Sequence, residues 1–93
     1  PMLTVMHNNR AWHQEYMFIQ YLAGVRGRGT DRGHIGCVLR DPFIDYSKMA
    51  QAYGMDSEGP IEDPALLAAA LGRGVESVKT GKPYLIDVVT QPR

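Results

Sequence analysis

Two adjacent asparagines, Asn8 and Asn9, follow the first apolar run of the chain, which spans residues 1–7. A run of this length is too short for a helix of its own and predicts a buried strand over residues 2–7. In a parallel α/β sheet, ligands bind at the carboxyl ends of the strands, where backbone N–H groups and helix N-termini converge. A side-chain amide oxygen there suits a hard cation that bridges phosphate groups. A plain turn explains the same pair, because Asn tolerates left-handed backbone angles and bonds to its own main chain.

The segments after the Asn pair predict alternating helices and strands. Apolar residues at three- and four-residue steps predict a helix over residues 11–22, which Gly24 would stop, followed by a glycine- and arginine-rich loop over residues 24–40. An acid followed by proline favours a helix start at Asp41-Pro42, with Gly54 as its end.

The same signal at Asp63-Pro64 predicts a further helix that runs to Lys79. Residues 55–61 fit either a short strand or an extended link, and residues 84–89 predict a strand covered on both faces. Apolar stripes are expected on the last two helices, made by Tyr46, Met49, Ala50 and Tyr53 and by Leu67, Leu71, Val75 and Val78. The order strand, helix, loop, helix, short strand, helix, strand predicts an α/β fold with a parallel sheet.

Composition excludes several classes of protein. With 44% hydrophobic and 22% charged residues, the chain is an ordinary globular sequence and not a disordered or fibrous one. No apolar run approaches the ~20 residues of a membrane span, and no signal peptide is apparent, so we expect a cytoplasmic protein. The single Cys37 excludes an internal disulfide and a cysteine-based metal cluster.

Charge is balanced overall but unevenly distributed. Residues 26–40 carry four arginines and one acid, whereas residues 41–63 carry six acids and one lysine. The basic loop could attract an anionic ligand, and solvated loop charges explain it equally well.

Three segments of the chain, in order and at plausible spacing, resemble segments of one enzyme family. Residues 7–15 resemble the second half of a cofactor motif that starts at Gly-Asp-Gly and ends at Asn-Asn. Residues 41–54 resemble a segment of proline, aromatic residue and acid before a helix that ends in aromatic-glycine, and residues 81–89 are similar to a closing strand. The family that these segments resemble is that of thiamine diphosphate-dependent enzymes of the acetolactate synthase type. The resemblance implies the second half of a parallel-sheet diphosphate-binding domain, covering residues 1–93 with the upstream Gly-Asp-Gly half missing.

The resemblance also implies site residues. Magnesium would be held by the Asn9 side chain and the Ala11 main-chain carbonyl, together with diphosphate oxygens, a water and the aspartate of Gly-Asp-Gly. Asn8 is then expected to hold the turn. The family's activating glutamate lies on a separate domain, so no catalytic residue is assigned here, and Glu15 is expected to be a surface acid. His13 fits either an exposed helix position or a substrate pocket.

The function implied for the parent protein is that of a lyase or transferase that decarboxylates and ligates 2-oxo acids with thiamine diphosphate and magnesium. We expect a homodimer or homotetramer without nucleic-acid or membrane partners, and an isolated fragment without activity. A 2-oxo acid or acyl-CoA decarboxylase of the same cofactor family is an alternative. A different class, a non-catalytic α/β module that binds RNA or another anion through its arginine loop, also stays open.

Overall fold

Residues 1–91, the part of the chain that the computed structural model describes, form three strands and three helices. Their order is strand, helix, helix, strand, helix, strand, with a long loop between the first two helices, which confirms the predicted α/β class. In chain order the elements are β1 (Leu3–Asn8), α1 (His13–Val25), α2 (Tyr46–Ala52), β2 (Asp56–Ile61), α3 (Pro64–Lys79) and β3 (Tyr84–Val89).

The chain divides into two compact units. The first, here called the sheet unit, comprises residues 1–8 and 45–90 and contains all three strands with α2 and α3. The second, here called the α1 unit, comprises residues 9–44 and 91 and contains α1 and the glycine-rich loop.

A parallel sheet with the strand order β1-β3-β2 forms the centre of the sheet unit. The central strand β3 carries the two largest fully buried side chains, Ile86 and Asp87, each with 0% exposure. The predicted strand over residues 84–89 is therefore confirmed, and β2 decides the open choice for residues 55–61 in favour of a strand. β1 runs one residue further than predicted and includes Asn8.

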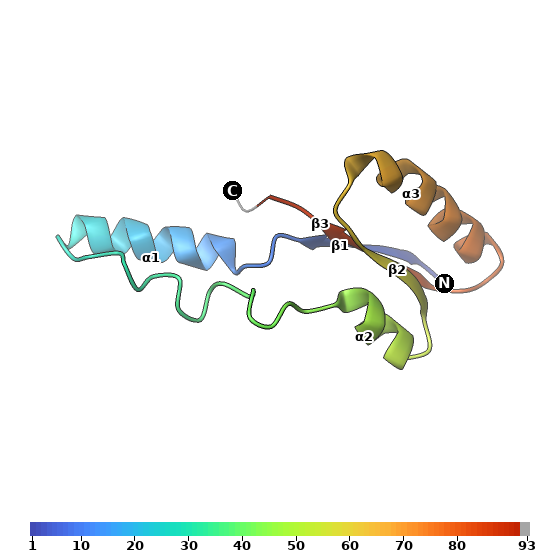
Figure 1. The fold of residues 1–93 in the computed structure, drawn as a ribbon, viewed down its shortest axis with the longest axis horizontal. Helices are drawn as coiled ribbons and strands as arrows, with labels where there is room; N and C mark the ends of the chain where they lie inside the picture. The colour runs from blue at the N-terminus through green and yellow to red at the C-terminus, as the bar shows by residue number, and fades with distance from the viewer. Residues whose placement is uncertain (92–93) are drawn as a thin grey trace. The chain divides into compact units, whose positions relative to one another are not determined.

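Helices α2 and α3 cover opposite faces of this sheet (Figure 1). α3 approaches through small residues, since Ala70 and Gly74 are buried and a side chain at Gly74 would meet Leu3 at 2.6 Å and Ile86 at 3.4 Å. α2 buries Ser47 and Ala50. The predicted apolar stripes are therefore partly wrong: Val75, Met49 and Tyr53 are exposed, because close helix-sheet contact selects the small residues instead.

Three of the predicted helix boundaries are confirmed and three are wrong; α3 ends at Lys79 as predicted, and α1 starts at His13 and not at Ala11. The Asp63 carboxylate caps α3 by accepting from Ala65 N at 2.9 Å with Pro64 in the first turn, and Gly54 follows the end of α2 with φ 79°. α2, however, starts at Tyr46 and not at Asp41-Pro42, because Asp45 supplies the cap. α1 also runs through Gly24, and the left-handed residue after it is Gly27 with φ 61°.

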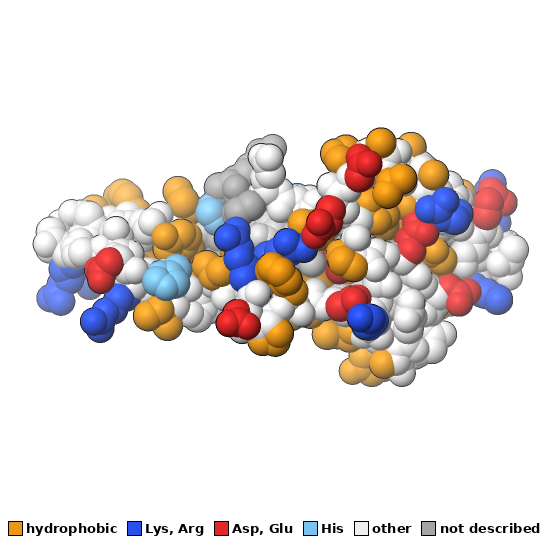
Figure 2. Space-filling view, in the orientation of Figure 1, with side chains coloured by type: hydrophobic (Ala, Val, Ile, Leu, Met, Phe, Trp, Pro, Cys, Tyr) orange, Lys and Arg blue, Asp and Glu red, His pale blue; other side chains and the backbone are white. Residues whose placement is uncertain are grey.

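The α1 unit contains little buried surface. None of the residues of α1 is buried, and Cys37 is the only buried side chain among residues 9–44. Backbone hydrogen bonds from Trp12 N to Cys37 O and from Leu39 N to Arg10 O join the start of the unit to the end of its loop. Large apolar side chains stay exposed, as Figure 2 shows in the regions of α1 and α3; on α1 they include Met17, Phe18 and Tyr21.

Within residues 1–91, none of the helices is long and apolar enough to pass through a bilayer.

Candidate cofactor site

The three strands of the sheet unit end at one edge because they are parallel, and the pairing of β2 with β3 shifts its register once, between Glu58 and Ile61. Asn8 of β1 pairs with Val89 of β3, and Ile61 of β2 pairs with Val88. A cavity of about 210 Å³ opens beside the ends of β2 and β3, where α3 begins; it is lined by Ile61, Glu62, Asp63, Pro64, Leu67, Val88, Val89 and Thr90. This carboxyl edge, next to a helix N-terminus, is where parallel α/β sheets bind ligands.

Asn9 opens a tight turn directly after β1. Its side-chain oxygen Oδ1 accepts a hydrogen bond from the backbone N–H of Ala11 at 3.1 Å, so the carboxamide folds back over its own main chain. Between them, Arg10 adopts φ 57°, the left-handed conformation that side chains rarely take. The Arg10 guanidinium stacks over the Phe43 ring at 4.1 Å from its centre. Asn9 thus forms the turn that its sequence favours, with its side chain bonded to its own main chain, and the left-handed residue of the turn is Arg10.

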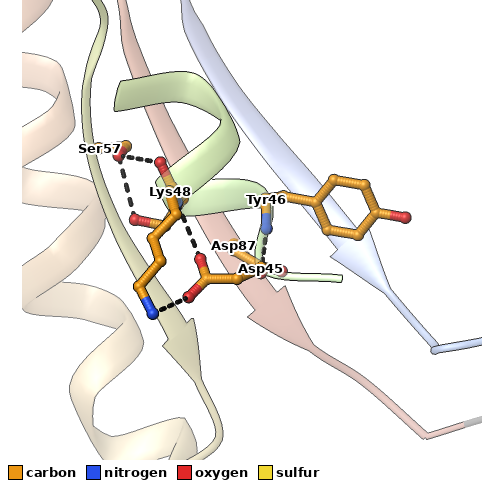
Figure 3. Close-up of polar contacts among 6 residues, drawn as sticks. Asp45, Tyr46, Lys48, Ser57 and Asp87 are labelled. Atoms are coloured by element: carbon orange, nitrogen blue, oxygen red, sulfur yellow. Dashed lines mark hydrogen bonds and ion pairs between the residues drawn. The ribbon is translucent and has the colours of Figure 1, made fainter. Parts of the chain in front are cut away.

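The residue before this turn, Asn8, is fixed to the central strand. Its side-chain Nδ2 donates to the Asp87 carboxylate at 3.0 Å, and its backbone carbonyl accepts from Thr90 N at 2.9 Å. The second Asp87 oxygen accepts from the backbone N–H of Tyr46 at 3.3 Å, a contact that Figure 3 shows at the start of α2. Asn8 is only 5% exposed. Asn8 therefore has a structural role as predicted, but its side chain anchors β1, whereas the Asn9 oxygen closes the turn.

The donor chemistry of the Asn9 turn fits magnesium. Asn9 and Ala11 are both half-buried, and the Ala11 carbonyl oxygen accepts no hydrogen bond from residues 1–91. Oδ1 of Asn9 has a second lone pair besides the one directed at Ala11 N. Asn9 Oδ1 and the Ala11 carbonyl oxygen are the kind of donor that magnesium prefers, since this ion is usually bound by one or two protein oxygens together with phosphate oxygens and water. The described residues hold no cluster of three or more His, Cys, Asp or Glu side chains that could bind a metal.

The other candidate residues, Glu15, His13 and the arginines of the loop, form no cluster of metal-binding side chains within residues 1–91. Glu15 is an exposed acid in the first turn of α1, as expected. His13 is half-buried, its ring meets Tyr16 edge-on at 6.1 Å, and its Nε2 is covered without a hydrogen-bond partner among the described residues. In the arginine loop, Arg32 lies 3.9 Å from Asp31, and both side chains are more than four-fifths exposed. The loop shows no built anion site.

Sequence reasoning missed Asp87. It is the one acid in an otherwise apolar strand, and an acid at a position expected to be covered on both faces is the signal that could have found it. Its partners are distant in sequence, since Asn8 lies 79 positions and Tyr46 lies 41 positions away.

Comparison with known protein families identifies a match over most of the chain. The model of the thiamine pyrophosphate enzyme C-terminal TPP-binding domain matches residues 1–88, nearly the whole chain. Comparisons with curated proteins and with solved structures gave no match. The parallel α/β sheet is consistent with this match, and this chain belongs to the family of thiamine pyrophosphate enzymes, as their C-terminal cofactor-binding domain.

Proposed function

We propose that this domain serves a thiamine diphosphate- and magnesium-dependent enzyme of the acetolactate synthase type, which decarboxylates a 2-oxo acid and joins the product to a second one. The family supplies the thiamine diphosphate dependence. The observation that supports a magnesium role is the turn at residues 9–11, which combines a half-buried amide oxygen with a carbonyl oxygen that accepts no hydrogen bond from the described residues.

In this proposal, Asn9 Oδ1 and the Ala11 carbonyl oxygen bind the magnesium ion that carries the diphosphate. Both donors are neutral, so the charge of the ion remains available to the phosphate oxygens. The bound cofactor supplies the nucleophilic carbon and the electron sink for C–C bond cleavage. The residues of this chain hold and orient its diphosphate end, and none of them is assigned a proton transfer.

A decarboxylase of 2-oxo acids or acyl-CoA compounds in the same cofactor family is the alternative. Product analysis separates the two: a carboligase forms a new C–C bond between two substrate molecules, whereas a decarboxylase releases the free aldehyde or acyl product. The match over residues 1–88 includes the arginine loop and favours a cofactor domain over an RNA-binding module. The homodimeric or homotetrameric assembly and the cytoplasmic location stay predictions.

The metal role is tested with Asn9→Ala in the full-length protein that carries this domain. We expect magnesium affinity, measured by calorimetry in the presence of thiamine diphosphate, to fall roughly 10-fold or more, because one oxygen donor is lost. Unchanged magnesium affinity would reject Asn9 as a ligand.

Two further variants separate the ligand from the turn. Asn9→Asp keeps an oxygen that can accept from Ala11 N and should retain magnesium binding. Asn9→Ser can also close the turn through its hydroxyl, but its shorter side chain should not reach the ion. If Asn9→Ser binds magnesium as well as the parent, the turn rather than the amide oxygen is what matters.

A further inference from the structure

The buried carboxylate of Asp87 has no role in the function proposed so far. It lies at the centre of the sheet with 0% exposure, in a strand whose other residues are apolar. Burying a carboxylate is costly, and replacing such a group by an apolar residue of similar size is often neutral or stabilising. A carboxylate at this position therefore calls for an explanation beyond packing.

The contacts of Asp87 point to the strand end that precedes the Asn9 turn. One oxygen accepts from the Asn8 side chain at 3.0 Å and the other from the Tyr46 backbone N–H at 3.3 Å. Asp87 and Asn8 share one face of the sheet, because Met6 pairs with Asp87 and Asn8 lies two residues further along β1. The backbone of Asp87 is also held closely, since a side chain at Gly59 would meet its carbonyl oxygen at 2.5 Å.

Asn8 is consequently fixed through both its side chain and its main chain. The Asp87 carboxylate holds the amide, and Thr90 N holds the carbonyl at 2.9 Å. The next peptide bond leads directly to Asn9, the first residue of the turn. Groups that orient a metal ligand without touching the metal typically change metal affinity 10- to 100-fold when they are mutated.

We propose that Asp87 is a positioning residue for the magnesium-binding turn, acting through its hydrogen bond to Asn8. This inference rests on the proposed metal role of Asn9. Asp87 touches neither metal nor substrate; it fixes the end of the strand to which the turn is attached.

The test exchanges the two partners in the full-length protein. Asp87→Asn keeps the side-chain volume but replaces one of the two accepting oxygens by an NH₂ group, so the side chain can no longer accept from both Asn8 and Tyr46. Asn8→Asp places a second carboxylate against that of Asp87. Each single variant should weaken magnesium binding, measured by calorimetry with thiamine diphosphate present, by about 10-fold. The double variant Asn8→Asp/Asp87→Asn restores one donor facing one acceptor, with an oxygen left for Tyr46 N, and should return to within about twofold of the parent.

Ser57→Ala is the matched control for a loss of stability alone. Ser57 bonds to Ser47, with its hydroxyl 2.8 Å from the Ser47 carbonyl, in the same unit but on β2. This variant should lower the melting temperature of the unliganded protein while magnesium affinity stays within about twofold of the parent. If Ser57→Ala weakens magnesium binding as much as Asp87→Asn, or if the exchange does not rescue, the positioning role is overturned.

The series also separates this inference from the function beneath it. If Asn9→Ala weakens magnesium binding and Asp87→Asn does not, only the role of Asp87 is overturned. If Asn9→Ala has no effect, the metal role of the turn is overturned, and the inference falls with it.

Discussion

Arg10 carries the backbone conformation on which the Asn9 turn depends. Its φ of 57° lies between the two proposed ligands, Asn9 and Ala11, and lets the Asn9 side chain reach back to Ala11 N. A left-handed residue with a side chain costs roughly 1–2 kcal/mol. The guanidinium over the Phe43 ring offsets part of this cost, since such contacts contribute about 0.5–1 kcal/mol at exposed sites.

Replacing Arg10 by glycine and by alanine isolates that backbone term. Both variants lose the same side-chain contacts, so their difference in stability reports the left-handed conformation together with the greater backbone entropy of glycine in the unfolded chain. We expect Arg10→Gly to be more stable to urea than Arg10→Ala by about 1 kcal/mol, the reverse of the usual order in helices and strands. Equal stability, or a more stable alanine variant, would show that residue 10 does not hold a positive φ.

The position of a single residue was predictable where it follows directly from the neighbouring sequence. Asn9 stands directly after an apolar strand, so its place at the strand's end follows from the sequence. Asp87 was not predictable in the same way, because its partners come from β1 and from the start of α2. Only the strand order β1-β3-β2 brings them together, and one chain's sequence does not state that order.

Among the helices, the starts of α2 and α3 depend on which acidic residue forms the capping hydrogen bond. Asp41-Pro42 and Asp45 both offer an acid before a helical stretch, and the structure uses Asp45, whose carboxylate accepts from Lys48 N at 2.8 Å (Figure 3). At Asp63-Pro64 no second acid follows within the first turn, and the predicted start is confirmed. Ambiguity arises where two capping residues compete within one turn.

The Asp45 cap predicts a pH dependence for the stability of the sheet unit. The Lys48 backbone N–H, more than the Lys48 charge, lowers the pKa of Asp45 below its usual 3.8. A carboxyl group whose pKa is lower in the folded state stabilises the fold above its unfolded pKa and loses that contribution as pH falls through the folded value. The melting temperature of the parent should therefore exceed that of Asp45→Ala at pH 7, and the difference should shrink below about pH 4.

Lys48→Met is the control for this effect. It removes the exposed ion pair, whose Nζ lies 3.4 Å from the Asp45 carboxylate, but it keeps the backbone N–H that donates to the cap. Because exposed ion pairs contribute little, the pH dependence should survive in this variant. Its disappearance would assign the effect to the lysine charge and not to the cap.

At the scale of the whole molecule, the pattern of elements predicted the fold class, but not the division into two units. The period of apolar residues identifies α1 as a helix without saying what it packs against, and none of its residues is buried in this structure. In the sheet unit, by contrast, β3 is covered on both faces and holds Ile86 and Asp87 out of contact with water. The two units therefore differ in how much burial stabilises them.

This difference in burial predicts which parts of the 93-residue chain unfold locally most often. Local stability follows buried contacts, so amide hydrogens in well-covered strands exchange only through large opening events, whereas poorly covered helices exchange through local fraying. In hydrogen exchange followed by mass spectrometry, peptides from β3 should be the slowest, and peptides from α1 should exchange well before them. The buried Cys37 end of the α1 unit, which bonds to Trp12, should fall between the two. If α1 exchanges as slowly as β3, the predicted difference in local stability between the two units is contradicted.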